Sequence, residues 1–204
     1  LIGVKAGDEV ISTALTAEPT NTTIALTGAK VVFADVDINT GLISPESIEA
    51  NINKNTKAIM VVHYAGMVCD MNRINALSEK YNIPVIEDAA HCFPSFYKGT
   101  PVGALSDITT FSFYATKTLA TGEGGMATTD HEELAEQMRI LRLHGISKDA
   151  WKRYTKMGNW YYEIIDVGYK YNITDIQAAL GLAQLRKADE LWQSRQRIAA
   201  RYHA

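Results

Sequence analysis

The sequence predicts an α/β domain built around a mostly parallel β-sheet. Short runs rich in β-branched residues alternate with helix-like runs along most of the chain, which is the pattern of βαβ units. The run from Lys57 to His63 is almost continuously apolar, as expected for a parallel strand buried on both faces. The 204 residues are 47% hydrophobic, enough to bury a substantial core.

Local signals place the individual elements. Thr20 to Thr27 is expected to form a short helix that Gly28 stops, and Ser44 is expected to cap a second helix that begins at Pro45. Helical periodicity predicts a third helix over residues 70–81. The expected strands are 10–15, 30–36, 57–63, 84–88, 108–113 and 125–129.

The C-terminal segment has a different pattern from the rest. Residues 174–201 carry one long helical pattern with Asp175 in the first turn, where a carboxylate suits the helix dipole. We therefore expect a domain over residues 1–170 and, over 171–204, a helix leading toward a second domain or a partner. The aromatic-rich stretch 148–166 is expected to be a functional loop. Because the chain starts at Leu1 rather than Met, we expect it to be part of a longer protein.

Charge and cysteine content indicate which binding partners and which cellular compartment to expect. The formal net charge is −3, with 20 basic and 23 acidic side chains, so nothing favours nucleic acid or an anionic membrane as partner. Cys69 and Cys92 do not have metal-ligand spacing, and we expect two reduced thiols in a cytoplasmic protein without a metal. No apolar run is long enough to span a bilayer, and the N-terminus does not have the pattern of a secretory signal.

Chemically capable side chains follow several of the expected strands. Ligands of open α/β sheets bind outside the carboxyl ends of the strands. Asp88 ends an apolar strand, where it could cap a helix, bond a nearby loop or hold a cation such as a protonated pyridine nitrogen. His91 follows it, and a core histidine is the simpler interpretation.

The strand that ends near residue 113 is followed by a second group. Lys117 could be an ordinary surface lysine or an amine that forms a Schiff base with an aldehyde. The Ser112 hydroxyl could bind a phosphate or simply satisfy a core polar group. The glycines of residues 122–125 match neither a P-loop nor a dinucleotide fingerprint, but they let the backbone approach a ligand closely.

Three motifs taken together are far more specific than any one of these residues. They are EDAAH at 87–91, SFYATKTLATGEGGMATTD at 112–130 and GYKYNITDIQAALGLAQL at 168–185. The chain resembles the sugar aminotransferases of the DegT/DnrJ/EryC1/StrS family, which use pyridoxal 5'-phosphate (PLP). The resemblance runs through nearly the whole chain. It implies the three-layer, aspartate aminotransferase-like large domain of a fold-type I PLP-dependent transferase.

The resemblance also implies residue roles. Lys117 would be the Schiff-base lysine, Asp88 would pair with the pyridine nitrogen, and Ser112 would bind the cofactor phosphate. His91 would lie beside the cofactor ring near its phenolic oxygen. Asn172 would reach the phosphate of the neighbouring subunit's cofactor, which implies a homodimer with shared active sites.

The resemblance implies an activity that moves an amino group from an amino acid, usually L-glutamate, to a keto-sugar linked to a nucleotide. Such reactions serve cell-surface polysaccharide or amino-sugar biosynthesis. A lysine at 117 favours transamination over the related dehydratases, which carry histidine there. An inactive homologue with a regulatory role, and a PLP-dependent dehydratase or lyase, are the two alternatives. The chain departs from the family at Ala17, where an aromatic residue usually packs near the cofactor.

Overall fold

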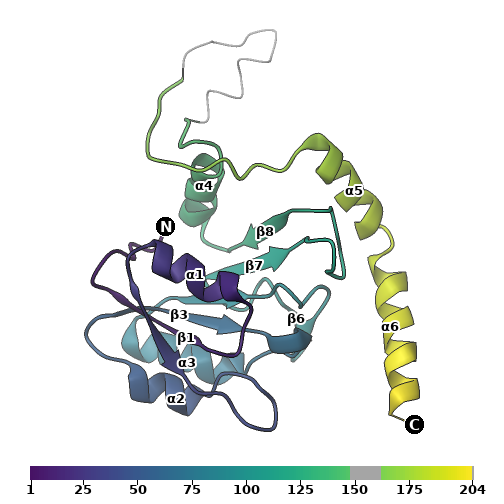
Figure 1. Ribbon diagram of the computed structural model, residues 1–204, viewed down its shortest axis with the longest axis horizontal. Coiled ribbons are helices and arrows are strands. Elements are labelled where there is room, and N and C mark those ends of the chain that lie inside the picture. Colours follow the sequence, from purple (N-terminus) through teal and green to yellow (C-terminus); the bar gives the residue numbers. More distant parts are fainter. Residues whose placement is uncertain (148–161, 204) are drawn as a thin grey trace. The chain divides into compact units, whose positions relative to one another are not determined.

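The computed structural model describes residues 1–147 and 162–203 (Figure 1). These residues form two compact units, which are described separately. One unit comprises Ile2–Thr129 together with the helical segment from Asp175 onward, and the other comprises Asp130–Thr174 with Leu1. The first unit holds the sheet. Four of the five residues expected at the cofactor belong to it.

A six-stranded sheet forms the centre of the first unit, in the order β2-β1-β3-β4-β7-β8. All neighbouring strands are parallel except β8, which is antiparallel to β7. The predicted mostly parallel α/β sheet is therefore confirmed. The strands are β1 (Glu9–Thr13), β2 (Lys30–Ala34), β3 (Thr56–Val62), β4 (Val85–Asp88), β7 (Ile108–Ser112) and β8 (Gly125–Thr128).

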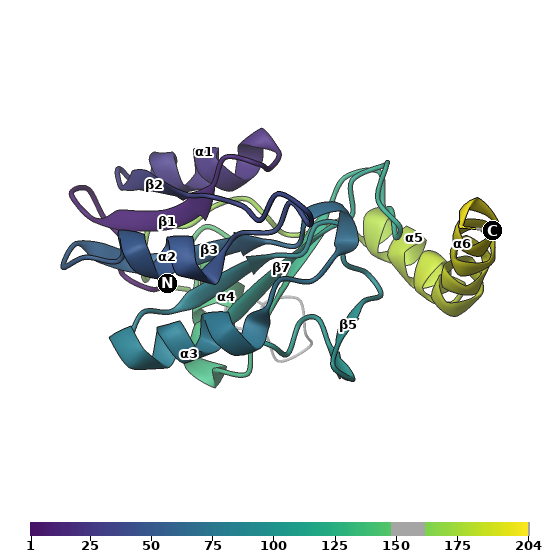
Figure 2. The ribbon, with the colours of Figure 1, turned by 90° about the horizontal axis from the view of Figure 1, so that it is seen from below.

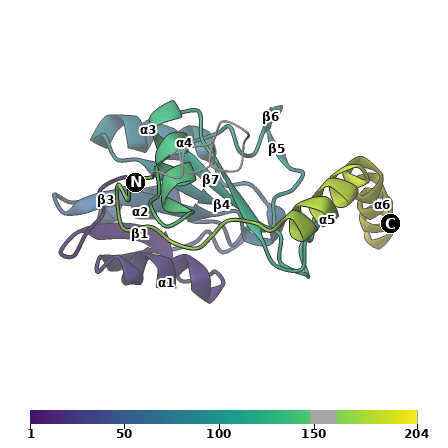
Figure 3. The same cartoon turned by 90° about the horizontal axis from the view of Figure 1, so that it is seen from above.

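Helices cover both faces of this sheet. Figures 2 and 3 show α1 (Glu18–Leu26) on one face, with α2 (Pro45–Asn51) and α3 (Met71–Tyr81) on the other. Side chains alternate along each strand, so the two faces build separate cores. Ile24 of α1 packs with Val10 and Ala58. The larger core joins α2 and α3 to the opposite face of the strands, through Ile11, Ile48, Ile59, Val61, Met71, Ile74, Leu77 and Val85.

The helix ends follow the local signals in the sequence. The Ser44 hydroxyl accepts a hydrogen bond from the Ser47 amide at 3.2 Å, and Pro45 lies in the first turn of α2, as predicted. The Asp70 side chain accepts from the Arg73 amide at 3.4 Å at the start of α3. That helix ends at Asn82, whose φ of 52° is a left-handed conformation that asparagine tolerates well. These residues set the start of α2, between β2 and β3, and both ends of α3, between β3 and β4.

The expected single helix over residues 174–201 is two helices, α5 (Asp175–Leu185) and α6 (Ala188–Tyr202). The helical hydrogen-bond pattern tightens between them, because the Lys187 amide bonds the Gln184 carbonyl three residues back. Asp189 and Glu190 then occupy the first turn of α6, where carboxylates favour a new helix start. A two-stranded hairpin, β5 (Phe96–Tyr97) and β6 (Thr100–Pro101), was not predicted.

The second unit contains α4 (Glu132–Leu141), also not predicted, and a crossing of extended segments. Isolated bridges pair Leu143 with Lys170 and Ile146 with Ile164. The rings of Tyr169 and Tyr171 stack, with centroids 4.7 Å apart. Most of the expected functional loop, residues 148–161, lies outside the described residues. Within the described ranges, the search for a helix long and apolar enough to cross a membrane finds none.

Both cysteines are buried free thiols, and we predict that they are unreactive in the native protein. Burial raises the pKa of each thiol to about 12, and the nearby Glu87 carboxylate adds to both increases. A raised thiol pKa favours the folded state below the unfolded value of about 8.5, and this contribution is lost as pH rises toward the folded pKa. At pH 8, reaction with a disulfide reagent should be at least about 100-fold slower in native than in urea-unfolded protein. Rapid titration of both thiols without denaturant would contradict this expectation.

Candidate active site

The carboxyl ends of four adjacent parallel strands, β1, β3, β4 and β7, form one edge of the sheet. The segment after each strand carries polar or basic groups. These segments hold Thr16 and Thr20 after β1, His63 to Gly66 after β3, Asp88 to His91 after β4, and Ser112 to Lys117 after β7. The expected gathering of Asp88, His91, Ser112 and Lys117 at one edge is therefore observed. Their roles toward a cofactor stay predictions.

Asp88 is the last residue of β4, and its side chain is half-buried. Its Oδ2 accepts a hydrogen bond from the Thr20 hydroxyl at 2.6 Å, and its Oδ1 accepts one from the Ala90 amide at 3.1 Å. An ionised carboxylate is acceptor-only and has about four lone-pair sites, so these two bonds leave capacity for another donor. The carboxylate is thus held in one orientation and can still receive a hydrogen bond from a cationic N–H group.

A chain of hydroxyl groups leads to Asp88 from the start of α1. The Oγ1 atoms of Thr16 and Thr20 lie 2.7 Å apart. The single hydroxyl proton of Thr20 is given to Asp88, so Thr16 must be the donor in this pair. The order of donation is Thr16 to Thr20 to Asp88. Neither threonine was predicted as a site residue from the sequence, because Thr20 and Asp88 are 68 positions apart and no local pattern connects them.

We predict that Thr20→Val destabilises the protein by about 1–2 kcal/mol, since the substitution removes the hydroxyl but keeps the shape of the side chain. Thr20 is only 5% exposed, so water has little access to replace the lost bond. Urea unfolding of the cofactor-free protein measures the change. Thr22→Val is the matched control, because Thr22 is exposed on the same helix. Equal stabilities of the two variants would show that the bond to Asp88 contributes nothing.

Ser112 and Lys117 lie in a compact turn at the end of β7. The Ser112 Oγ accepts a hydrogen bond from the Tyr114 amide at 3.3 Å, and the Lys117 amide donates to the Tyr114 carbonyl at 2.9 Å. Among residues 1–147 and 162–203, the Ser112 hydroxyl proton has no acceptor and the Lys117 Nζ has no partner. A donor for a phosphate and an amine for an aldehyde are therefore available at this strand end.

Backbone contacts tie the neighbouring loops together. Gly66 has a φ of 87°, and a Cβ atom built on it would lie 2.9 Å from the His91 carbonyl oxygen, so only glycine fits at this approach. The Thr118 hydroxyl donates a hydrogen bond to the Phe93 carbonyl. The loop after β3 therefore packs closely against the loop that carries His91, and the segment after β7 is hydrogen-bonded to the same loop. The His91 side chain itself is exposed, which contradicts the simpler interpretation of a core histidine.

Glu87, next to Asp88, is completely buried. Its Oε2 lies 2.6 Å from His63 Nε2, and its Oε1 accepts from the hydroxyls of Ser106 at 2.6 Å and Thr109 at 2.8 Å. Burial alone would raise the pKa of this carboxyl group, but the three hydrogen bonds outweigh burial and lower it. Glu87 is therefore ionised at neutral pH. Glu87 was not predicted as a site residue from the sequence.

Asn172 is the fifth residue predicted to bind the cofactor. Asn172 belongs to the other unit; it is half-buried, and its Oδ1 has no hydrogen-bond partner among the described residues.

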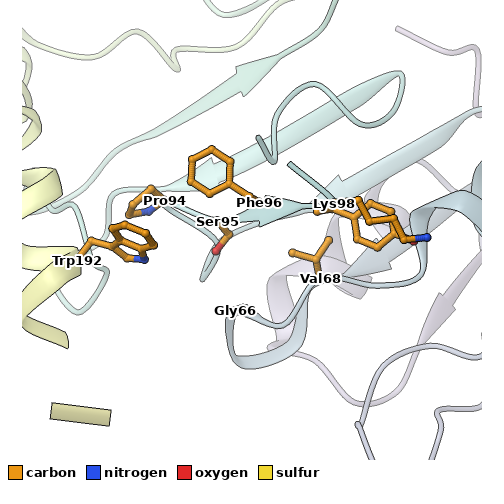
Figure 4. A pocket seen from close by; sticks show the side chains of 8 residues that line it. Gly66, Val68, Pro94, Ser95, Phe96, Lys98 and Trp192 are labelled. Atoms are coloured by element: carbon orange, nitrogen blue, oxygen red, sulfur yellow. The ribbon is translucent and has the colours of Figure 1, made fainter. Parts of the chain in front are cut away.

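A cavity of about 450 Å³ opens beside the β5–β6 hairpin and is lined by Gly66, Val68, residues 94–98 and Trp192 (Figure 4). None of the five predicted cofactor residues lines this cavity. It therefore adds no residue to the predicted cofactor site.

The available groups fit PLP in chemical terms. The edge offers an oriented carboxylate for a protonated ring nitrogen and, as far as the described part of the chain shows, a free hydroxyl proton for a phosphate and an unpartnered amine for an aldehyde. A parallel sheet with these groups at its carboxyl edge is the class of domain that the sequence predicts. The family model of the DegT/DnrJ/EryC1/StrS aminotransferases matches residues 1–204, and the chain belongs to this family.

Individual relatives agree with this assignment. The spore coat polysaccharide biosynthesis protein SpsC of Bacillus subtilis is 52% identical over 200 residues, which are 98% of this chain and 51% of SpsC. The structure of Spr1654 of Streptococcus pneumoniae, a candidate sugar aminotransferase in its PMP form, superposes with a TM-score of 0.91 at 38% identity and covers 98% of this chain and 55% of Spr1654.

A third relative is PseC of Helicobacter pylori, an aminotransferase involved in the biosynthesis of pseudoaminic acid. Its structure matches with a TM-score of 0.89 at 33% identity, over 98% of this chain and 51% of PseC. The expected PLP-dependent transferase fold is thereby confirmed. The chain spans about half the length of the curated relatives it matches.

Proposed function

We propose that the protein carrying this chain is a PLP-dependent aminotransferase that transfers an amino group from an amino acid to a keto-sugar. The observation that carries the proposal is the oriented Asp88 carboxylate at the same sheet edge as the Lys117 amine, which has no partner among the described residues. Family membership supports it, as do a relative in polysaccharide biosynthesis and a neighbour solved in PMP and PLP forms. A nucleotide-linked sugar and L-glutamate are the proposed acceptor and donor.

The proposed roles follow from the positions of the side chains. When bound, PLP supplies the electron sink for the carbanion that forms at the amino acid's α-carbon. Asp88 accepts a hydrogen bond from the protonated ring nitrogen and keeps the proton there, because an ionised carboxylate stabilises a neighbouring cation. The Lys117 amine would hold the cofactor aldehyde and, in its neutral form, would accept the proton that leaves the α-carbon of the amino acid.

The remaining predicted residues hold the cofactor in place. The Ser112 hydroxyl accepts a hydrogen bond from the Tyr114 amide and would donate a hydrogen bond to the phosphate. His91, which is exposed at the edge, is proposed to lie beside the ring. Asn172 is proposed to bind the phosphate in the neighbouring subunit of a homodimer, which would make each active site a product of two chains.

The visible absorption spectrum tests the proposal. Protein supplied with PLP should show the band of lysine-bound cofactor, and L-glutamate should convert this band to that of the aminated cofactor. A band that does not respond to glutamate or to other amino acids would favour a lyase or dehydratase. If protein expressed from the full-length gene gives no band with PLP, the result would favour an inactive homologue. Subsequent addition of keto-sugar nucleotides should regenerate the first band and identify the acceptor.

A further inference from the structure

The buried network around Glu87 joins three strands at the level of the site. His63 follows β3, Glu87 lies in β4 and Thr109 lies in β7, so the carboxylate connects all three. The His63 Nδ1 accepts a hydrogen bond from the Cys69 amide at 3.3 Å. Its Nε2 therefore carries the proton and donates to Glu87. The histidine is therefore held as one tautomer.

Neighbouring residues of a strand point to opposite faces of the sheet, and β4 presents its two carboxylates in this way. Glu87 pairs in register with Val61 and Thr109, on the face covered by α2 and α3. Asp88 turns to the face of α1, where Thr20 binds it. The backbone between them is fixed as well, since the His63 amide donates to the Asp88 carbonyl at 3.1 Å and the Ala89 amide to the Thr110 carbonyl at 2.8 Å.

Burying a carboxylate in an apolar core is costly unless hydrogen bonds compensate for the lost hydration. Val61 and Val85, on the same face of the sheet as Glu87, are apolar and fully buried, so the carboxylate lies in an apolar core. The carboxylate accepts hydrogen bonds from three donors, one after β3 (His63) and two at or just before the start of β7 (Ser106 and Thr109). It does so directly behind the residue proposed to orient the cofactor.

We propose that Glu87, held by His63, Ser106 and Thr109, is a positioning residue that fixes the Asp88 carboxylate from the opposite face of the sheet. This inference rests on the proposed function for its cofactor readout. Glu87 touches neither cofactor nor substrate in this scheme. It acts by keeping the ends of β3, β4 and β7 at fixed separation, so that Asp88 meets the ring nitrogen without reorganisation.

The test compares Glu87→Leu with Glu87→Gln and with the control Val85→Ala, which weakens the same core without touching the network. Glu87→Leu should raise the PLP dissociation constant about tenfold, because the hydrogen bonds that orient the strand end are lost. Glu87→Gln should stay within about threefold, since the amide oxygen can still accept from His63 while the Ser106 and Thr109 hydroxyls both reverse and accept from the amide NH2 group. Val85→Ala should also stay within about threefold, despite its lower melting temperature.

A double-mutant cycle separates positioning from general stability. In an Asp88→Asn background, Glu87→Leu should add less than about threefold to the dissociation constant, because its effect passes through Asp88. If the loss persists undiminished there, or if Val85→Ala causes an equal loss, the proposal is overturned. Should Glu87→Leu fail to fold, Thr109→Val replaces it with a smaller expected effect of the same pattern.

A second readout needs no cofactor. Hydrogen exchange at the amides of His63, Ala89 and Ala90 in cofactor-free protein should accelerate about tenfold in Glu87→Leu, while the amides of β1 and β2 exchange at the native rate. Native exchange at those three amides would overturn the proposal. If Glu87→Leu shows the expected exchange pattern but the wild-type protein never binds PLP, the proposed function fails and the positioning role of Glu87 stands.

Discussion

Replacing Lys117 by alanine should lower the turnover of amino transfer by at least about 1,000-fold, because the variant loses both the amine that binds the cofactor aldehyde and the proton carrier. Among the described residues, the Lys117 side chain has no hydrogen bond or ion pair to lose. The free energy of unfolding should therefore change by no more than about 0.5 kcal/mol. Steady-state kinetics with L-glutamate and urea unfolding together measure the two effects.

Lys57→Ala is the matched control for this experiment, since Lys57 is an exposed lysine near the opposite end of the sheet. It should leave both turnover and stability unchanged. The absorption band of lysine-bound cofactor should disappear from Lys117→Ala even when PLP remains bound without a covalent bond. Normal amino transfer by Lys117→Ala would refute the proposed mechanism.

Asp88→Asn should lower turnover by about 100-fold or more, since the neutral amide cannot stabilise a positive charge on the ring nitrogen. Asparagine keeps a carbonyl oxygen that can accept from Thr20 or from the Ala90 amide, so the strand end should remain folded. The loss should appear in the proton-transfer step. Single-turnover kinetics with α-deuterated glutamate measure that step directly.

The control for Asp88→Asn is Asp130→Asn, which makes the same charge change at an exposed position. It should leave the proton-transfer rate unaltered. A wild-type rate in Asp88→Asn would mean that another group stabilises the ring nitrogen. Asp88 would then have the purely local role of accepting from Thr20 and Ala90.

The sequence by itself determined the features that depend on short stretches of chain. Apolar strands alternating with helical runs predicted the parallel sheet, and Ser44 with Pro45 predicted the start of α2. The carboxyl ends of parallel strands meet at one edge, so the gathering of Asp88, Ser112 and Lys117 followed from their places after strands. The division between α5 and α6 was not predicted, because the two residues between these helices are Arg186 and Lys187, and neither is a glycine or proline that would indicate a helix end.

Only the tertiary structure decided which groups act on these residues. Thr20 and Asp88 are 68 positions apart, and Glu87 and His63 are 24 apart, so no local pattern connects them. The EDAAH motif indicates only that Glu87 is a polar residue at a strand end. In the folded protein Glu87 is buried in an apolar core, where its carboxylate is hydrogen-bonded to His63, Ser106 and Thr109. Hydrogen bonds across strands depend on register and on facing direction, and both are set when the sheet assembles.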